Sequence, residues 1–314
     1  MYNVSVSPHI REQSTTRSIM RDVAIALIPT LAFGVYRFGI GALKTIALCV
    51  AVCIACEAIF EIIIKKPVTV HDNSAMVTGL ILALNLPPTA PWWMPVIGGA
   101  FAIIVVKMLF GGIGQNFMNP ALAARCFLLI SFTQRMTDFT VDGVSGATPL
   151  ALLKAGEKTD LLTLFLGYHG GCIGEVSSLA ILIGGLYLIV KKIISVRIPA
   201  VYIGSTVIFV FMINLISGGD ISPVYLLSHV LSGGLLAGAF FMATDYVTSP
   251  ITAKGQIVFG VILGLLTALF RCVGSSAEGV SYAIIIGNLL VPIIEKVTVS
   301  KPFGFEKAKG GNKQ

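Results

Sequence analysis

Charged residues are scarce in this sequence. Asp, Glu, Lys and Arg make up 12% of its 314 residues, about half of the roughly 25% that is usual in a soluble domain. Apolar residues make up 55%. This balance excludes an ordinary soluble domain and predicts a protein that crosses the membrane many times.

Three other features are missing. The first twenty residues are polar and carry Arg11 and Arg17 without an apolar core, so no cleavable signal peptide is visible and the first span must act as the insertion signal. The six cysteines lie mostly inside apolar runs, which argues against a disulfide framework. The run GGIG at 111–114 follows no strand and lacks the lysine and hydroxyl of a P-loop, which excludes that kind of phosphate site.

Long apolar windows are what the sequence has in abundance. Windows of about 17 to 22 residues match the length of a helix that crosses the hydrocarbon core. They predict an all-α polytopic membrane protein with about ten transmembrane helices. The predicted spans are residues 23–41, 45–64, 74–90, 93–110, 118–134, 176–190, 198–217, 224–243, 256–271 and 279–295.

The distribution of basic residues predicts the orientation of these spans. An even number of spans puts both termini on one side, and that side holds fifteen of the twenty-two lysines and arginines. This count assigns Lys107 to the side of the termini and Arg271, which follows the ninth span, to a loop on the other side. By the positive-inside rule the termini are cytoplasmic. The formal net charge of +7 is therefore a topology signal and does not predict a nucleic-acid partner.

A long polar loop at 135–175 divides the chain into two halves. It follows five predicted spans, so it should lie outside the cytoplasm, between a first repeat at 23–134 and a second repeat at 176–296. Five spans in each half would invert the second half relative to the first, as in transporters built from inverted repeats. Residues 1–22 and 297–314 would form a cytoplasmic arm and a cytoplasmic tail.

The residue on which the functional prediction depends is Thr148. It lies in DGVSGATPL at 142–150, behind small residues and ahead of Pro149. Small neighbours leave its hydroxyl uncrowded, and the following proline favours an extended backbone, so the pattern is typical of a site that presents a hydroxyl for covalent attachment. Taken alone, the pattern reads first as a turn or a helix N-cap.

Two groups of polar residues lie inside the second predicted span. Cys49, Cys53 and Cys56 share one helical face. Their spacing is compatible with an iron–sulfur or metal site, but no fourth ligand is nearby, so we interpret them as packing residues. Glu57 is a carboxylate within a span, where it needs a partner or an ion. Two roles stay open for it: structural pairing and cation handling.

Two asparagines precede the fifth predicted span, and an aspartate follows the eighth. Asn116 and Asn119 either cap a helix or hydrogen-bond the edge of a flavin ring, which needs both donors and acceptors. Asp245 lies just past a glycine-rich span, where its oxygens suit Na+ or a proton relay. The competing interpretation is that Asp245 and Thr248 cap the loop. Thr244 and Ser249 are the other hydroxyl residues near Asp245.

Several stretches of the sequence resemble one family of membrane subunits. It comprises the D subunits of Rnf complexes and the related B subunits of Na+-translocating NADH:quinone oxidoreductases. The quinone-reductase subunits usually carry a longer amino-terminal portion, so we identify the chain as a member of the Rnf branch. The matching stretches are SPH at 7–9, SAMVTGL at 74–80, PWW at 91–93, GGIGQNFMNPA at 111–121, DGVSGATPL at 142–150 and MATD at 242–245.

The resemblance implies a fold and two flavins. The fold would be that of urea and ammonium transporters, with two inverted five-helix repeats. A flavin transferase would join the phosphate of FMN to the threonine hydroxyl, and the asparagines would hold a non-covalent riboflavin, as in the quinone-reducing relative. The residues implied in flavin binding are Thr148 as the attachment point, Asp142, Ser145, Gly146, Ala147, Asn116 and Asn119.

The resemblance also implies an activity and its partners. Electrons would pass between ferredoxin and NAD+ in a bacterial or archaeal cell membrane, coupled to movement of Na+ or H+, with Rnf subunits A, B, C, E and G as partners. Asp245 and Glu57 are the candidate ion path. A flavin on an extracytoplasmic Thr148 could not react directly with cytoplasmic NADH and would need a relay through the membrane. Two alternatives stay open: the quinone-reductase subunit, and a non-redox channel or transporter with the same fold.

Overall fold

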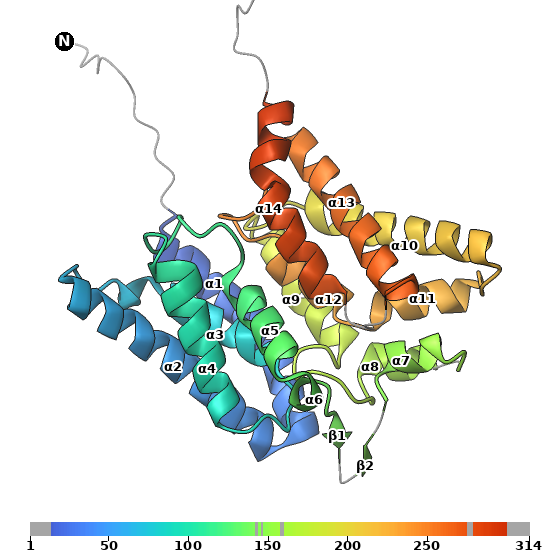
Figure 1. Cartoon of the computed structure of the whole chain (residues 1–314), viewed down its shortest axis with the longest axis horizontal. Coiled ribbons are helices and arrows are strands. Elements are labelled where there is room, and N and C mark those ends of the chain that lie inside the picture. The colour runs from blue at the N-terminus through green and yellow to red at the C-terminus, as the bar shows by residue number, and fades with distance from the viewer. Residues whose placement is uncertain (1–13, 142–143, 146, 158–159, 275–278, 300–314) are drawn as a thin grey trace, which may run out of the picture.

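The computed structural model describes residues 14–141, 144–145, 147–157, 160–274 and 279–299. Helices form nearly all of its regular structure, and a single two-stranded hairpin lies in the described part of the connecting segment (Figure 1). The start of α1 and the end of α14 lie at one edge of the molecule, and the hairpin lies at the opposite edge. This arrangement agrees with termini that share one side and a central loop on the other.

The first half of the chain contains two long helices followed by shorter ones. The helix α1 begins inside the arm predicted at 1–22, because Thr15 and Ser18 form a capping box there. Pro87 and Pro88 follow α3 and prevent it from continuing. The elements are α1 (Thr16–Phe38), α2 (Ile40–Ile64), η1 (Val70–Asp72), α3 (Ser74–Leu84), α4 (Trp93–Ala100), its π-helical continuation η2 (Phe101–Met108), α5 (Pro120–Ser131) and α6 (Thr133–Met136).

The connecting segment and the second half follow. The hairpin is antiparallel, with Thr140 opposite Ser145 and Val141 opposite Val144. The elements are β1 (Thr140–Val141), β2 (Val144–Ser145), α7 (Pro149–Lys154), α8 (Leu161–Leu166), α9 (Ser178–Val190), α10 (Arg197–Ser217), α11 (Pro223–Leu231), α12 (Leu235–Ala237), the π-helical η3 (Gly238–Met242), α13 (Ala253–Cys272) and α14 (Val280–Thr298).

All ten predicted windows coincide with helices, but their lengths differ from the prediction. Among the described residues, α1, α2, α10, α13 and α14 are long and apolar enough to cross a membrane as single helices. The window at 224–243 is a broken helix, in which α11 and the α12–η3 segment are bent by 58°. The windows at 74–90, 93–110, 118–134 and 176–190 contain shorter apolar helices of 10–17 residues. The chain is therefore a polytopic membrane protein, with 5 or 6 candidate spans and four shorter apolar helices among its described residues.

A buried arginine stabilises the break in the eighth window. Gly233 and Gly234 both have positive φ (70° and 64°), which ends α11 and redirects the chain into α12. The guanidinium of Arg271 donates hydrogen bonds to the carbonyls of His229, Ser232 (3.0 Å) and Gly233 (2.9 Å). These carbonyls would otherwise lack partners inside the protein. Arg271, which the prediction placed in a loop, lies in the last turn of α13 and is 1% exposed.

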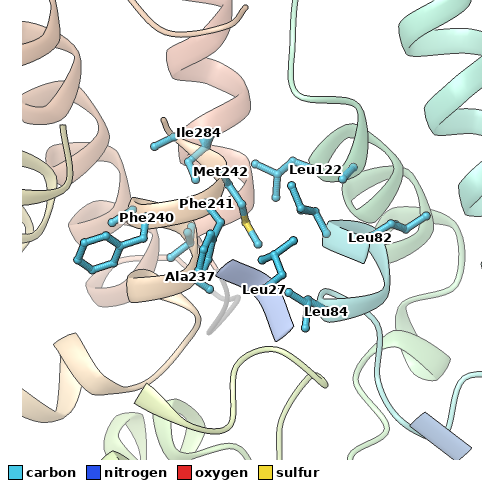
Figure 2. Close-up of a cluster of buried hydrophobic side chains, with 14 of the residues drawn as sticks. Leu27, Leu82, Leu84, Leu122, Ala237, Phe240, Phe241, Met242 and Ile284 are labelled. Atoms are coloured by element: carbon cyan, nitrogen blue, oxygen red, sulfur yellow. The ribbon is translucent and has the colours of Figure 1, made fainter. Parts of the chain in front are cut away.

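The main hydrophobic core lies where the two halves meet. Its side chains come from α1, α3 and α5 of the first half and from α9, α12–η3 and α14 of the second. Figure 2 shows Leu27, Leu82 and Leu122 facing the segment from Ala237 to Met242, with Ile284 beside it. The helix α1 also packs along α9. Close van der Waals packing of these side chains holds the two halves together.

Candidate functional site

An open cavity on the side of the termini brings together three of the residues singled out in the sequence. Asn116, Asn119 and Asp245 all line it, although Asp245 is far from the asparagines in the chain. Its empty volume is ≈ 790 Å³, which includes open solvent at its mouth. The cavity lies between the first turns of α1, α3 and α5, the end of η2, and the turn after η3.

Asn119 is the N-cap of α5. Its side-chain oxygen accepts hydrogen bonds from the backbone N–H groups of Ala121 (3.1 Å) and Leu122 (3.3 Å), and its amide nitrogen donates to the carbonyl of Met242 (3.4 Å). The capping interpretation is therefore confirmed for this residue. The bond to Met242 also ties the start of α5 to the end of the broken helix.

The side-chain amide of Asn116 makes fewer hydrogen bonds than that of Asn119. It is buried at the cavity wall, and its amide nitrogen donates one hydrogen bond, to the carbonyl of Met118 (3.3 Å). The amide can donate a second bond and accept two more. Of the two asparagines, Asn116 is the one whose amide is available to a ligand in the cavity.

Asp245 closes the turn that follows η3. Thr248 donates hydrogen bonds from its hydroxyl to the Asp245 carboxylate (3.1 Å) and from its N–H to the Asp245 carbonyl (3.3 Å). The loop-capping interpretation is confirmed, and the carboxylate also reaches the cavity. Burial raises the pKa of Asp245 above its ordinary value, against the opposing effect of hydrogen bonds from Thr248 and Val247. The neighbouring Thr244 also lines the cavity, and its hydroxyl donates to the carbonyl of Phe240 (2.7 Å).

Glu57 is part of a buried ion pair, which confirms the pairing interpretation. Its carboxylate lies 2.7 Å from Nζ of Lys107, and the two side chains are 1% and 4% exposed. Lys107 also donates a hydrogen bond to Oγ of Ser74 (2.6 Å). The count of basic residues included Lys107 among the charges on the side of the termini, near the end of the fourth predicted span. Lys107 lies in η2, where the wider π-helical turn alters which residues face inward, and such turns are frequent at functional sites.

Thr148 is the N-cap of α7. Its hydroxyl accepts a hydrogen bond from the N–H of Ala151 (3.3 Å), and in the described part of the chain it donates none. The residue is only 8% exposed, so the expectation of an uncrowded hydroxyl is not met, whereas Ala147 beside it is exposed. The proline at 149 occupies the first helical position, which favours the extended backbone of Thr148 and starts the helix.

The rest of the predicted flavin-binding stretch is described only in part. Ser145 ends strand β2. Asp142 and Gly146 lie outside the described residues. The hairpin β1–β2, which precedes Thr148 in the chain, lies at the edge opposite the termini (Figure 1), and Thr148 is not among the residues that line the cavity. The structure therefore does not bring Thr148 together with Asn116, Asn119 and Asp245.

The cysteines of α2 lie in apolar surroundings. Cys49 and Cys53 are fully buried, Cys56 is half-buried, and all are free. Cys53 packs with Ala75 and Ile103 in a small hydrophobic cluster, as expected of a packing residue. Among the described residues, no group of three or more His, Cys, Asp or Glu side chains is placed to hold a metal ion.

Comparison with known sequences gives the family of the chain. The sequence model of the NQR2, RnfD, RnfE family matches residues 3–304. The chain belongs to the NQR2, RnfD, RnfE family. The resemblance seen in the short motifs therefore extends over nearly the whole chain, the two halves and the connecting segment included.

Individual members of the NQR2, RnfD, RnfE family are similar over their full length. The D subunit of the Na(+)-translocating ferredoxin:NAD(+) oxidoreductase complex of Acetobacterium woodii is 51% identical, over 98% of this chain and 96% of the relative. The D subunit of the proton-translocating ferredoxin:NAD(+) oxidoreductase complex of Clostridium ljungdahlii is 41% identical, over 97% and 96%. The D subunit of the ion-translocating oxidoreductase complex of Stutzerimonas stutzeri is 38% identical, over 93% of each chain.

Proposed function

We propose that this chain is the membrane D subunit of an ion-translocating ferredoxin:NAD+ oxidoreductase complex of the Rnf type. The observation that carries the proposal is the 51% identity over 98% of the chain to a relative with that name. The other Rnf subunits, A, B, C, E and G, would handle ferredoxin, NAD+ and the remaining electron carriers. The role of this subunit is to hold flavin and to provide part of the ion path.

The residue proposed to carry covalent FMN is Thr148. Two features of the structure fit this role. The hydroxyl acts only as an acceptor, and an ester oxygen retains lone pairs that can still accept the bond from Ala151. Ala147 next to it is small and exposed, which leaves space on one side for a transferase and for the ring system. FMN, when bound there, supplies one- and two-electron transfer. A separate transferase with a metal-bound FAD is needed because a threonine hydroxyl is a poor nucleophile.

The proposed topology has ten helical segments in two inverted repeats, with cytoplasmic termini. Supporting this topology, the ten predicted windows all contain helices, and the start of α1 and the end of α14 share one edge (Figure 1). The hairpin that precedes Thr148 lies at the opposite edge, so the connecting segment with Thr148 would be extracytoplasmic. Electrons from cytoplasmic donors would then need carriers in other subunits to reach it.

The cavity near Asn116 is the proposed position of a non-covalent riboflavin. Its mostly apolar walls suit a planar ring system, and the Asn116 amide provides the donor and acceptor that a ring edge requires. We expect Asn116→Leu to remove most of the non-covalent flavin from the purified complex, measured by chromatography of the flavin released on denaturation. Gln115→Leu changes an exposed neighbour and should leave the flavin content unchanged. Equal riboflavin in both variants would contradict this position.

Asp245 is the proposed ion-binding carboxylate of the same cavity. Burial raises its pKa, so protons compete with Na+ for the carboxylate up to a higher pH than at an ordinary aspartate. The half-saturating Na+ concentration should therefore fall as pH rises through this pKa and increase as pH falls. Asp245→Asn should raise it on the order of tenfold at the higher pH and flatten its pH dependence, because a charged oxygen ligand is lost.

The measurement for Asp245 is the Na+ dependence of ferredoxin:NAD+ activity of the assembled complex across a pH series. The control is Asp160→Asn, which changes an exposed aspartate at the start of α8. If Asp245→Asn has the affinity and the pH profile of the wild type, Asp245 does not bind the ion.

Mass spectrometry of the mature complex tests the proposed function directly. The peptide that contains Thr148 should carry the mass of FMN, and a topology reporter inserted beside it should report an extracytoplasmic position. An unmodified peptide from a complex co-expressed with its flavin transferase would exclude the covalent carrier role and favour a non-redox transporter with the same fold.

A further inference from the structure

Lys107 lies at the boundary between two cavities. It lines the open cavity that contains Asp245, and its partner Glu57 lines a second cavity between the end of α2 and the glycine-rich loop at 111–114. The second cavity has an empty volume of ≈ 580 Å³, including its mouth. The Lys107–Glu57 ion pair, at 2.7 Å, therefore lies at the wall between the two spaces. Separation of this pair would connect them.

The surroundings of Lys107 contain more acidic groups than basic ones. Glu61 lies one turn beyond Glu57 on α2, is 3% exposed, and lines the second cavity with it. Asp72 and Glu61 are both close enough to act electrostatically on Glu57. Glu57 therefore lies close to two other carboxylates, and Lys107 is the basic group in direct contact with it. Glu61 is already satisfied by the N–H (2.9 Å) and the hydroxyl of Thr69, which leaves Glu57 dependent on Lys107.

Lys107 has a second acidic partner within reach. Its ammonium donates to Oγ of Ser74 (2.6 Å), and this hydroxyl donates in turn to the carboxylate of Asp72 (2.6 Å). A small movement of the flexible lysine side chain along this chain of contacts would bring the ammonium from Glu57 to Asp72. Glu57 would then face the second cavity without its partner. A buried carboxylate without a partner is strongly unfavourable, so it would bind a cation from that cavity.

We propose that Lys107 acts as a tethered cation that competes with Na+ for Glu57, and so decides when the path between the two cavities is open to the ion. The inference rests on the proposed ion-translocating function. It extends that function by joining Glu57 and Asp245 in one path and by giving Lys107 the role of a positioning residue. In one state Lys107 is paired with Glu57, and the two cavities are separated. In the other state Lys107 is held by Ser74 and Asp72, and Na+ occupies Glu57.

The test is the Na+ dependence of ferredoxin-dependent NAD+ reduction by assembled complexes that carry single and double substitutions. Lys107→Met removes the competing charge, so the half-saturating Na+ concentration should fall about tenfold. Lys107→Arg keeps the charge, so its half-saturating Na+ concentration should remain close to that of the wild type. Lys44→Met removes an exposed lysine at the opposite end of α2, away from both cavities, and should leave the half-saturating Na+ concentration unchanged.

The double variant Glu57→Gln/Lys107→Met separates a switching role from a structural one. If Lys107 acts through Glu57, removing Lys107 should no longer increase Na+ affinity once Glu57 is neutral. Because both charges are then replaced by neutral groups of similar size, the double variant should assemble even if Lys107→Met alone assembles poorly. Covalent flavin per complex, measured by in-gel fluorescence, reports assembly independently of activity.

Three results would overturn the inference. In the first, Lys107→Met lowers the amount of complex while the assembled fraction keeps the half-saturating Na+ concentration of the wild type. In the second, Lys107→Met has the same effect on Na+ affinity with and without Glu57. In the third, the wild-type complex reduces NAD+ with ferredoxin independently of Na+, which removes the Na+ switch and leaves the proposed electron-transfer function in place. A complex that lacks ferredoxin-dependent NAD+ reduction altogether would remove both proposals.

Discussion

Thr148→Ala should abolish the covalent flavin of this subunit. In-gel ultraviolet fluorescence of the denatured protein, co-expressed with its flavin transferase, should show a band for the wild type and none for the variant. The variant lacks the only side-chain oxygen at this position, so no phosphoester can form there. It also loses the N-cap of α7, which costs about 1 kcal/mol. That loss is small against a typical domain stability of about 5–15 kcal/mol, so the variant should still fold.

Two matched variants distinguish loss of the attachment point from loss of a helix cap. Thr148→Ser keeps both the hydroxyl and the cap, and we expect it to retain at least part of the fluorescence. Thr252→Ala removes the threonine that caps α13, whose hydroxyl accepts from the N–H of Gly255 (3.0 Å), and should leave the fluorescence intact. Persistent fluorescence in Thr148→Ala would show that the flavin is attached elsewhere.

The helices could be predicted from the sequence, but their lengths could not. Each of the ten apolar windows contains a helix, whereas α7 and α8 lie in the stretch predicted to be a polar loop. Apolar composition does not distinguish a helix long enough to cross the membrane from a shorter apolar helix. The difference depends on local stop signals. Pro87 and Pro88 follow α3, Asn119 starts α5 late, and Gly233 and Gly234 break the eighth window.

The burial of charged residues inside helices was the feature of the fold that could least be predicted from the sequence. Lys107 was counted among the charges on the side of the termini, and Arg271 was placed in the loop after the ninth predicted span. Each is buried because a partner distant in sequence meets it: Glu57 is fifty positions from Lys107, and His229 is forty-two from Arg271. No periodic pattern carries that information. A carboxylate inside a span, such as Glu57, is the one available signal that a buried cation exists somewhere in the fold.

The candidate site shows why structural and functional interpretations of one residue are not exclusive. Thr148 and Asn119 both cap helices, as short polar side chains before a proline commonly do. Asp245 caps a turn and also reaches the cavity. Capping could be predicted from neighbouring residues. The convergence of Asn116 and Asp245 on one cavity could not, because it depends on the packing of the first half against the second.

Gly184→Ala should prevent the two halves from packing and cause a large loss of stability. Gly184 lies in α9 where it crosses α1, and an added Cβ would lie 2.0 Å from the carbonyl oxygen of Ala26 and 2.9 Å from the ring of Phe241. The nearest atom belongs to the backbone of a helix, so it cannot move aside as a side chain could. Overpacking of this kind costs about 3 kcal/mol or more. For a protein of this size we expect Tm to fall by roughly 6–12 °C, or no folded subunit to accumulate.

Gly204→Ala is the matched control for Gly184→Ala. Gly204 also lies inside a long helix, α10, but an added Cβ there would have no heavy atom within 4 Å. Alanine also favours a helix more than glycine does, so this variant should accumulate at the wild-type level with an equal or slightly higher Tm. Size-exclusion chromatography in detergent and thermal unfolding of both variants give the comparison. The helices α1 and α9 belong to different halves, so a stable Gly184→Ala variant would mean that the halves pack differently. The cavity that Asn116 and Asp245 share would then not form as described.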